Sequence, residues 1–316
     1  MPSKADFSRS ALSLAVAVTL LAGCGGGGGG GGDQFAGSVA CVGSGSRAAA
    51  TGYTATPSAG FGTRASGDDT LFARQWHLQN TGQVDGAVAG EDINVAGVWD
   101  SFDGSGVRIA VVDDGLEIGH ADLAANVVPG ASHDYLSGGS DPTGGSHGTS
   151  VAGVAAAVGF NDLGVRGVAP AADLVGFNLL QAFNDGNQGD AMARDLQVAV
   201  SNNSWGPEDA TGRLLDSSAL WRAGVDSGTA NGRNGLGTAY FWAAGNGGRS
   251  VDNSNYDGYA NYSRVMAIAA LDASGRRASY SEPGANLLVA APAGEFCNGS
   301  QTPQATVTVD RSGADG

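Results

Sequence analysis

The 316-residue sequence has only four histidines, and one of them stands in a setting suited to acid–base chemistry. His147 lies in the stretch GGSHGTS (residues 144–150), where glycines on both sides let the backbone turn and leave the imidazole accessible. The residues that follow, 151–158, have apolar side chains at helical spacing with small residues between them, which predicts a buried helix. A histidine that opens such a helix can be held by a carboxylate and still face a substrate.

Asp113 is a carboxylate that could hold this histidine. It follows a largely apolar run, 107–112, that predicts a buried strand, and Asp114 comes directly after it. Two carboxylates at the end of a buried strand are unfavourable unless they are paired, and a histidine is an obvious partner. An Asp–His pair of this kind can activate a hydroxyl nucleophile, although these two residues alone do not define an enzyme.

The amide of Asn246 is a third chemical group. It lies in Gly-Asn-Gly-Gly (residues 245–248), directly after an apolar run that predicts a strand at 239–244. An asparagine between glycines at a strand end can point its amide into a cleft, which is the geometry of an oxyanion donor. The alternative interpretation is a plain turn in which asparagine tolerates a positive φ.

These groups belong to an alternation of short apolar runs and helical patterns. Strands are predicted at 107–113, 173–180, 202–205, 239–244, 265–271 and 287–291, and helices at 150–158, 190–200 and 218–230. The alternation indicates a three-layer α/β fold, in which a mostly parallel sheet is covered by helices on both faces. Function in such sheets gathers at the carboxyl ends of the strands, where Asp113 and Asn246 stand.

Taken together, the motifs resemble the kexin/furin branch of the subtilisin-like serine peptidases. The resemblance is carried by VDDGLE (112–117), HADL (120–123), SHGTSVAG (146–153), SWGPED (204–209) and WAAGNGG (242–248). It extends from about Asp69 to Val309, and the aspartate precedes the histidine, as in subtilisin. It implies an endopeptidase that hydrolyses proteins or peptides after basic residues.

The resemblance also assigns roles to aligned residues. It makes Asp113 the aspartate that orients the histidine, His147 the general base and acid, and Asn246 the oxyanion donor. Carboxylates that favour Arg or Lys match Asp209 and Asp257, which line the pocket for the residue before the cut, and Asp114, which lies at the next pocket.

Two calcium sites are implied in the same way, and their oxygen ligands suit a hard cation. Ligands of the first site match the side chains of Asp69, Asp122 and Asn161 and the backbone carbonyls of Gly159, Leu163 and Val165. Ligands of the second site, behind the basic-residue pocket, match Asp209, Asp252 and Glu282.

Two features depart from the family pattern. The family's nucleophile stands in Gly-Thr-Ser followed soon by proline, but Gly-Thr-Ser at 148–150 belongs to the histidine motif and lacks the proline. We expect the serine just beyond Gly316, so that the sequence stops before it; the alternative is a calcium-stabilised pseudopeptidase that binds peptides without cutting them. Gly144 replaces an acid of furin-like enzymes, which puts strict dibasic selectivity in doubt.

The N-terminus carries an export signature. An apolar stretch at 11–22 follows two basic residues, is too short to span a bilayer, and leads into Leu-Ala-Gly-Cys24. This resembles a bacterial lipobox, which implies a lipoprotein signal peptide at 1–24, acylation of Cys24 and anchoring to a membrane of the cell envelope, facing the periplasm or the exterior. Residues 25–66 begin with eight glycines and predict a flexible tether, and residues 67–316 form the catalytic domain.

Composition sets further bounds. The formal net charge of −15 argues against nucleic acid as a partner and suits calcium and basic substrates. Three cysteines are too few for a disulfide scaffold, and if Cys24 is acylated then Cys41 and Cys297 remain available to pair. A zinc hydrolase is not supported, because no two of the histidines share metal-type spacing.

Overall fold

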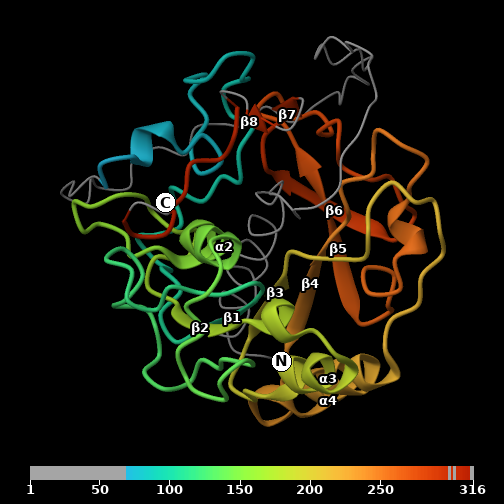
Figure 1. Cartoon of the computed structure of the whole chain (residues 1–316). Helices are drawn as coiled ribbons and strands as arrows, with labels where there is room; N and C mark the ends of the chain where they lie inside the picture. Colours follow the sequence, from blue (N-terminus) through green and yellow to red (C-terminus); the bar gives the residue numbers. More distant parts are fainter. Residues whose placement is uncertain (1–68, 298–299, 302–303, 314–316) are drawn as a thin grey trace, which may run out of the picture.

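The computed structural model describes residues 69–297, 300–301 and 304–313 (Figure 1). The signal segment at 1–24 with Cys24, the tether at 25–66 and Cys41 lie outside the described residues, as does the side chain of Cys297. Within the described ranges, no helix has the length and apolar character needed to cross a membrane.

A six-stranded sheet forms the centre of the domain, in the spatial order β2-β1-β3-β4-β5-β6. Its strands are β1 (Arg108–Val112), β2 (Asp173–Phe177), β3 (Val200–Asn203), β4 (Ala239–Ala243), β5 (Val265–Leu271) and β6 (Leu287–Pro292). Every neighbouring pair is parallel, which confirms the predicted sheet. Parallel pairing brings the ends of β1 and β4 to one edge, separated only by β3 and therefore by roughly 10 Å.

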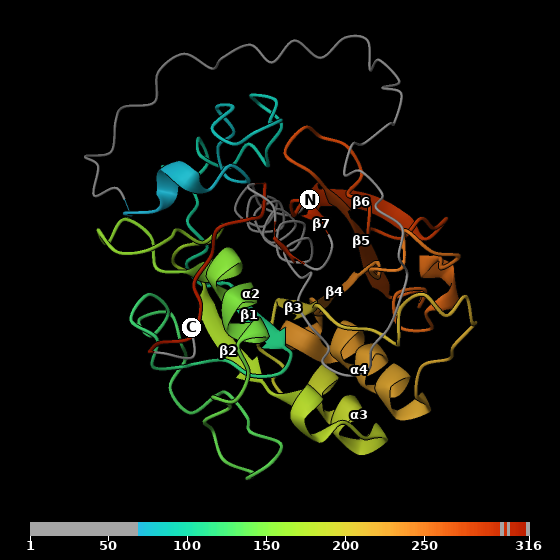
Figure 2. The same ribbon diagram turned by 45° about the horizontal axis from the view of Figure 1, so that its top comes forward.

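Helices cover both faces of the sheet, as predicted. The helices are α2 (His147–Ala156), α3 (Asp185–Ala193) and α4 (Ala219–Gly235). Along β1, Ile109 and Val111 face the core that contains α2, whereas Ala110 and Val112 face the core that contains α3 and α4. Figure 2 shows α3 and α4 side by side, apart from α2.

Short elements complete the described chain. They are the 3-10 turns η1 (Phe72–Arg74), η2 (Leu179–Ala182) and η3 (Ser254–Tyr256), and the antiparallel pair β7 (Phe296–Cys297) and β8 (Ser300–Gln301).

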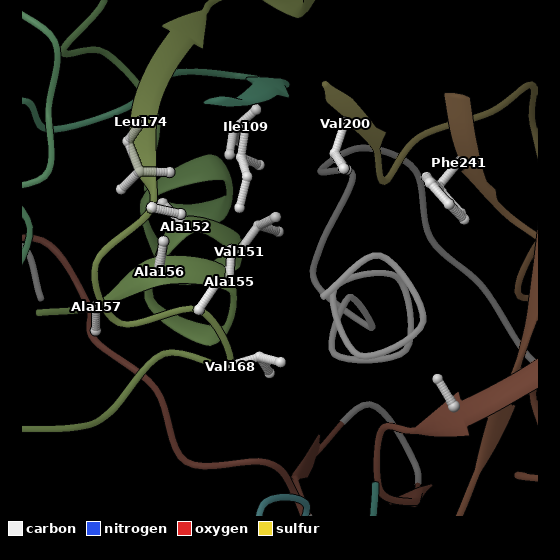
Figure 3. Packing of buried hydrophobic residues seen from close by; sticks show 14 of the residues in the cluster. Ile109, Val151, Ala152, Ala155, Ala156, Ala157, Val168, Leu174, Val200 and Phe241 are labelled. Atoms are coloured by element: carbon white, nitrogen blue, oxygen red, sulfur yellow. The ribbon is translucent and has the colours of Figure 1, made fainter. Parts of the chain in front are cut away.

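The helix α2 is a buried helix built from small residues. Eight of its ten residues are buried, which fits an apolar sequence without a polar face. Figure 3 shows Ile109 and Leu174 of the sheet close to Val151, Ala152 and Ala155 of α2. Small side chains let the helix lie close to the strands, and its first residue is His147.

Most predicted boundaries differ from the structure by a few residues. The strand predicted at 202–205 begins two residues earlier, at Val200, and the helix predicted at 190–200 is α3, which begins at Asp185 and ends at Ala193. The run of residues at 306–310 forms no strand. It lies instead against α2, where the Thr308 hydroxyl donates a hydrogen bond to the Ser150 carbonyl.

Candidate active site

The structure brings Asp113 and His147 into direct contact. Asp113 follows the last residue of β1, and its side chain is fully buried. His147 opens α2, and its Nδ1 lies 2.7 Å from Asp113 Oδ1. The imidazole retains 22% of its exposure, so the ring is held on its Nδ1 side by a buried carboxylate while part of it reaches the surface.

The charge of Asp113 depends on this contact. Burial raises the pKa of the Asp113 carboxyl, and the neighbouring His147 pulls that pKa down. The other oxygen of the carboxylate, Oδ2, is buried with no hydrogen-bond partner among the described residues. Oδ1 also accepts a hydrogen bond from the Asp114 backbone N–H at 2.7 Å. A buried carboxylate stabilises positive charge on the imidazole that it contacts, which is what a histidine base requires after it accepts a proton.

Two glycines let β1 and α2 approach this closely. A Cβ atom on Gly148 would lie 2.0 Å from the Gly115 carbonyl oxygen and 2.9 Å from Asp113 Cβ. A Cβ atom on Gly115 would lie 2.4 Å from the Gly145 backbone nitrogen. Any larger residue at either position would push the start of α2 away from the end of β1 and lengthen the Asp113–His147 contact.

Asp114 caps the helix that carries the histidine. Its two carboxylate oxygens accept hydrogen bonds from the backbone N–H groups of His147, at 3.2 Å, and Gly148, at 2.8 Å. These N–H groups belong to the first turn of α2, which has no capping bond from the Ser146 side chain. Asp114, assigned to substrate binding from the sequence, therefore also fixes the backbone of His147.

Asn246 lies in the loop after β4, at the same edge of the sheet. Its backbone N–H donates to Asp209 Oδ1 at 2.8 Å, and its side-chain amide makes a long contact of 3.3 Å with Asp209 Oδ2. Gly245, with φ of 101°, provides the turn that exposes the asparagine. The structure thus joins Asn246 and Asp209, which come from two different loops.

An acidic pocket extends from Asn246. It is formed by the chain after β3, the chain after β4 and the segment 252–257. Its charged lining consists of Glu208, Asp209, Asp252, Asp257, Glu282 and one cation, Arg213. The four acids predicted for the substrate pocket and the second calcium site, Asp209, Asp252, Asp257 and Glu282, all lie here.

The acids of this pocket disfavour one another's charge. Burial, with further contributions from Asp209 and Asp252, raises the pKa of Asp257 to about 6, against hydrogen bonds from backbone N–H groups that lower it. Burial, together with the charges of Asp252, Asp209 and Asp257, raises the pKa of Glu282 to about 7, against a hydrogen bond from the Gly247 N–H that lowers it. Such a set of oxygen ligands fits a divalent cation or a basic side chain, because either would relieve the repulsion.

The residues predicted for the first calcium site also lie together. Asp69 Oδ1 accepts from the Asn161 backbone N–H at 2.9 Å, and Asp122 Oδ1 accepts from the Asn161 side-chain amide at 2.8 Å. Asp122 Oδ2 accepts from the Val165 N–H at 2.9 Å. The loop that contains Gly159 and Leu163 therefore closes around both acids.

Among the described residues, the single group of three His or carboxylate ligands with atoms within 4.8 Å of one another is Asp113, Asp114 and His147. The hydrogen bonds above already use this group to hold α2 against β1. No three acids of the pocket have carboxylate oxygens that all lie within 4.8 Å of one another.

Arg166 is the main site residue that the sequence prediction missed. It makes an ion pair with Asp69, with 2.6 Å between Arg166 Nε and Asp69 Oδ2. Its signal in the sequence was a lone charge inside the apolar run Val-Arg-Gly-Val-Ala (165–169). Trp205 was also missed: its indole N–H donates to the Val112 carbonyl at 3.0 Å and ties the loop after β3 to the end of β1.

A parallel α/β sheet with an Asp–His pair and an asparagine amide at its carboxyl edge is the arrangement of the subtilisin-like serine peptidases. The chain belongs to the subtilase family, whose model matches residues 104–315.

Curated relatives include the proprotein convertase subtilisin/kexin type 7 of Mus musculus, 36% identical over 254 residues, which are 77% of this chain and 32% of that protein. The calcium-dependent protease of Nostoc sp. is 36% identical over 262 residues, 78% of this chain and 38% of that protein. The chain thus spans about a third of the length of these relatives. Among solved structures, the serine protease of Aeromonas sobria matches with a TM-score of 0.64 and 35% identity, over 73% of this chain and 44% of that one.

Proposed function

We propose that this chain is the catalytic part of a serine endopeptidase that hydrolyses proteins or peptides after Arg or Lys. The observation that carries the proposal is the acidic pocket, which begins at Asn246 on the edge of the sheet that also holds the Asp113–His147 pair. A substrate whose basic side chain enters the pocket would present its scissile carbonyl beside Asn246. A relative from Schizosaccharomyces pombe, a dibasic-processing endoprotease 38% identical over 231 residues, supports this specificity.

Each group has one task in the proposed reaction. Asp113 orients His147, and His147 takes a proton from the nucleophile and returns it to the leaving amine. The side-chain amide of Asn246 gives up its long contact with Asp209 and donates a hydrogen bond to the developing oxyanion. Each oxygen of Asp114 accepts one backbone N–H, which leaves lone pairs for a basic side chain at the next substrate position.

The nucleophile of this proposal is a serine outside residues 1–316, because the family's serine motif does not occur in them. The same observation favours the second candidate function, a pseudopeptidase that binds basic peptides without cutting them. Reading the coding sequence beyond codon 316 separates the two: a Gly-Thr-Ser motif followed by proline supports the peptidase, and a continuation without it supports the pseudopeptidase.

The specificity can be tested by binding to the 316-residue chain itself. Fluorescent peptides that end in Arg and in Leu resemble products of cleavage after those residues. We expect the Arg peptide to bind at least about tenfold more tightly, since 1.4 kcal/mol of pairing with the acids produces that ratio. Asp257→Asn should reduce the ratio, and the exposed-acid control Asp100→Asn, which changes the charge equally, should preserve it. Equal affinity for both peptides in the unsubstituted chain would refute the basic specificity.

Calcium is part of the proposal. Asp209, Asp252 and Glu282 would hold the ion behind the basic-residue pocket, as the repulsion among these acids and the calcium-dependent relative from Nostoc suggest. A bound calcium supplies positive charge that lets the carboxylates ionise together at neutral pH. These residues thereby keep the loops after β3 and β4 in place around the substrate.

We also propose that the protein is anchored in the cell envelope through lipid on Cys24. Support comes from the lipobox-like sequence and the eight glycines after it. Metabolic labelling with a fatty-acid analogue should mark the protein, and Cys24→Ser should remove the label. An unlabelled native protein, or a labelled serine variant, would rule out this attachment. Two acyl chains suffice for stable anchoring, whereas one is marginal.

A further inference from the structure

Arg166 is one of the most deeply buried charges of the described chain. Its side chain is 4% exposed, and Asp69, its partner, is 2% exposed. The guanidinium Nε lies 2.6 Å from Asp69 Oδ2. A buried ion pair of this kind persists only when both charges have their partners, because neither can reach water.

Three aromatic rings enclose the guanidinium. Its central carbon lies 3.8 Å from the ring centroid of Phe160, 4.3 Å from that of Phe72 and 5.0 Å from that of Trp99. The rings contact one another edge to face, with centroids 6.0 Å apart for Phe72 and Trp99 and 5.9 Å apart for Trp99 and Phe160. Aromatic faces attract a cation, and this cage is shaped for a planar guanidinium.

The Asp69 carboxylate is already satisfied by these contacts. Oδ2 accepts from Arg166 Nε and from the Phe160 N–H at 3.1 Å, and Oδ1 accepts from the Asn161 N–H. Two backbone donors and one full positive charge neutralise the acid without a metal ion. A divalent cation placed between Asp69 and Asp122 would sit beside the guanidinium and be repelled by it.

The acids of the pocket lie in a different electrostatic setting. The ion pairs of the described residues include Asp69 but not Asp209, Asp252 or Glu282. One acidic cluster therefore contains an arginine in direct ion-pair contact, whereas Asp209, Asp252 and Glu282 of the other have no such ion pair among the described residues, although Arg213 lines the same pocket.

We propose that Arg166 replaces calcium as the counter-ion of Asp69, so that the cluster of Asp69, Asp122 and the loop 159–165 binds no calcium. The chain then binds at most one calcium, at the acids of the pocket. The Asp69–Arg166 pair fastens the start of the described domain to the loop after α2 at any calcium concentration. Loss of calcium would destabilise the loops of the substrate pocket, whereas the Asp69–Arg166 ion pair would remain intact.

The test is the number of calcium ions per folded 316-residue chain, measured by equilibrium dialysis with radioactive calcium. We expect one ion for the unsubstituted chain, one for Asp122→Asn and none for Glu282→Gln, with folding verified by circular dichroism. Two ions in the unsubstituted chain, or loss of an ion in Asp122→Asn, would overturn the proposal. No ion in the unsubstituted chain would support the role of Arg166 and refute only the calcium site proposed at the pocket.

A second measurement uses terbium, whose luminescence is excited through nearby tryptophan. Trp99 borders the Arg166 cage, so an ion bound at Asp69 would be sensitised by it. We expect any tryptophan-excited terbium signal of the unsubstituted chain to be unaffected by Asp122→Asn. A signal that Asp122→Asn abolishes would place a cation at this cluster and contradict the proposal.

Removing the guanidinium should create a calcium requirement. In Arg166→Leu, Asp69 is left buried beside Asp122, so calcium should raise the melting temperature more than it does in the unsubstituted chain, and Asp69→Asn should remove the gain. The matched control is Arg108→Leu, which removes another paired arginine, one that binds Asp195 at 2.8 Å. Equal calcium responses in the Arg166 and Arg108 variants would contradict the proposal. If Arg166→Leu does not fold, the ion count of the unsubstituted chain decides.

Discussion

His77 shows how one buried side chain can set the acid stability of the domain. The residue is fully buried, and neither ring nitrogen has a hydrogen-bond partner among the described residues. Burial lowers the pKa of the imidazole from 6.5 to about 3, because the protonated ring cannot be solvated in the core. The folded protein therefore holds His77 neutral at pH values where the unfolded chain protonates it.

We predict from this shift that the free energy of unfolding decreases as the pH falls below about 6.5. Between that value and about 3 the unfolded state binds one more proton at His77 than the folded state does, so stability falls by about 1.4 kcal/mol per pH unit from this residue. Above pH 6.5 both states are neutral and the contribution is constant. Urea denaturation at a series of pH values measures the slope.

The control for this prediction is His77→Leu, which removes the titrating group but keeps the core apolar. Between pH 4 and 6, the free energy of unfolding of this variant should change less with pH than that of the unsubstituted chain. The two slopes should differ by about 1.4 kcal/mol per pH unit, because the variant takes up one proton fewer on unfolding. Identical slopes for the two proteins would show that carboxylates, and not His77, govern acid unfolding.

At the residue scale, the sequence predicted contacts that follow from strand ends and helix starts. Asp113 and His147 meet because a parallel sheet brings the end of β1 to the start of α2. Arg166 could not be predicted in the same way, since its partner Asp69 lies 97 positions earlier and its aromatic cage comes from three separate segments. Such partners depend on packing that no local pattern encodes.

The contact between helices α3 and α4 depends on glycines. A Cβ atom on Gly224 would lie 2.3 Å from the Gly189 carbonyl oxygen, and a Cβ atom on Gly189 would lie 2.8 Å from the Leu220 carbonyl oxygen. We predict that Gly224→Ala destabilises the domain by about 1–3 kcal/mol, because α4 must move away from α3. Thermal melting measures the loss.

A matched substitution separates crowding from the general effect of replacing glycine. Gly97 has no heavy atom within 4 Å of the position of a Cβ, so Gly97→Ala should alter stability by less than about 0.5 kcal/mol. A Gly224→Ala variant as stable as Gly97→Ala would mean that the two helices tolerate a wider separation.

At the scale of elements, the errors of prediction have identifiable causes. The start of strand β3 was placed too late because Val200, its first residue, was assigned to the helix predicted at 190–200, and the strand itself contains the fully buried polar residues Asn202 and Asn203. The helix α3 begins Asp-Gly-Asn (185–187), a sequence with poor helix propensity, but the Asn184 side chain caps it and α4 packs on it. Tertiary contacts here outweigh local preference.

At the scale of the whole molecule, we predict that the 316-residue chain alone does not hydrolyse peptides. Asp113 and His147 activate a nucleophile whose motif the sequence lacks, and in subtilisin itself loss of the serine lowers kcat about 2 × 10⁶-fold. The measurement is turnover of a fluorogenic Arg peptide by the purified chain. Turnover that His147→Ala abolishes would show that a hydroxyl within these residues serves as the nucleophile.

Calcium should stabilise the domain through the acids of the pocket. Glu282 is 4% exposed and Asp257 is 9% exposed, so water screens their repulsion poorly, and a bound cation compensates it. Binding to the folded state alone adds about 2.7 kcal/mol when the ligand is in hundredfold excess over its Kd. Extracellular calcium sites have Kd values of about 10⁻⁴–10⁻³ M, so millimolar calcium should raise the melting temperature measurably above that in chelator.

Magnesium distinguishes a built calcium site from general screening of negative charge. The pocket acids Asp209, Asp252 and Glu282 come from three separate segments of the chain, and calcium accepts flexible coordination by such oxygen ligands. Magnesium demands tight octahedral geometry and retains its waters, so it should restore little of the stability that calcium provides. Glu282→Gln should remove most of the calcium effect, because it deletes one ligand charge while keeping the side chain's shape. Equal stabilisation by both ions, or a calcium effect that survives Glu282→Gln, would show that calcium acts on the net charge of −15 and not at this pocket.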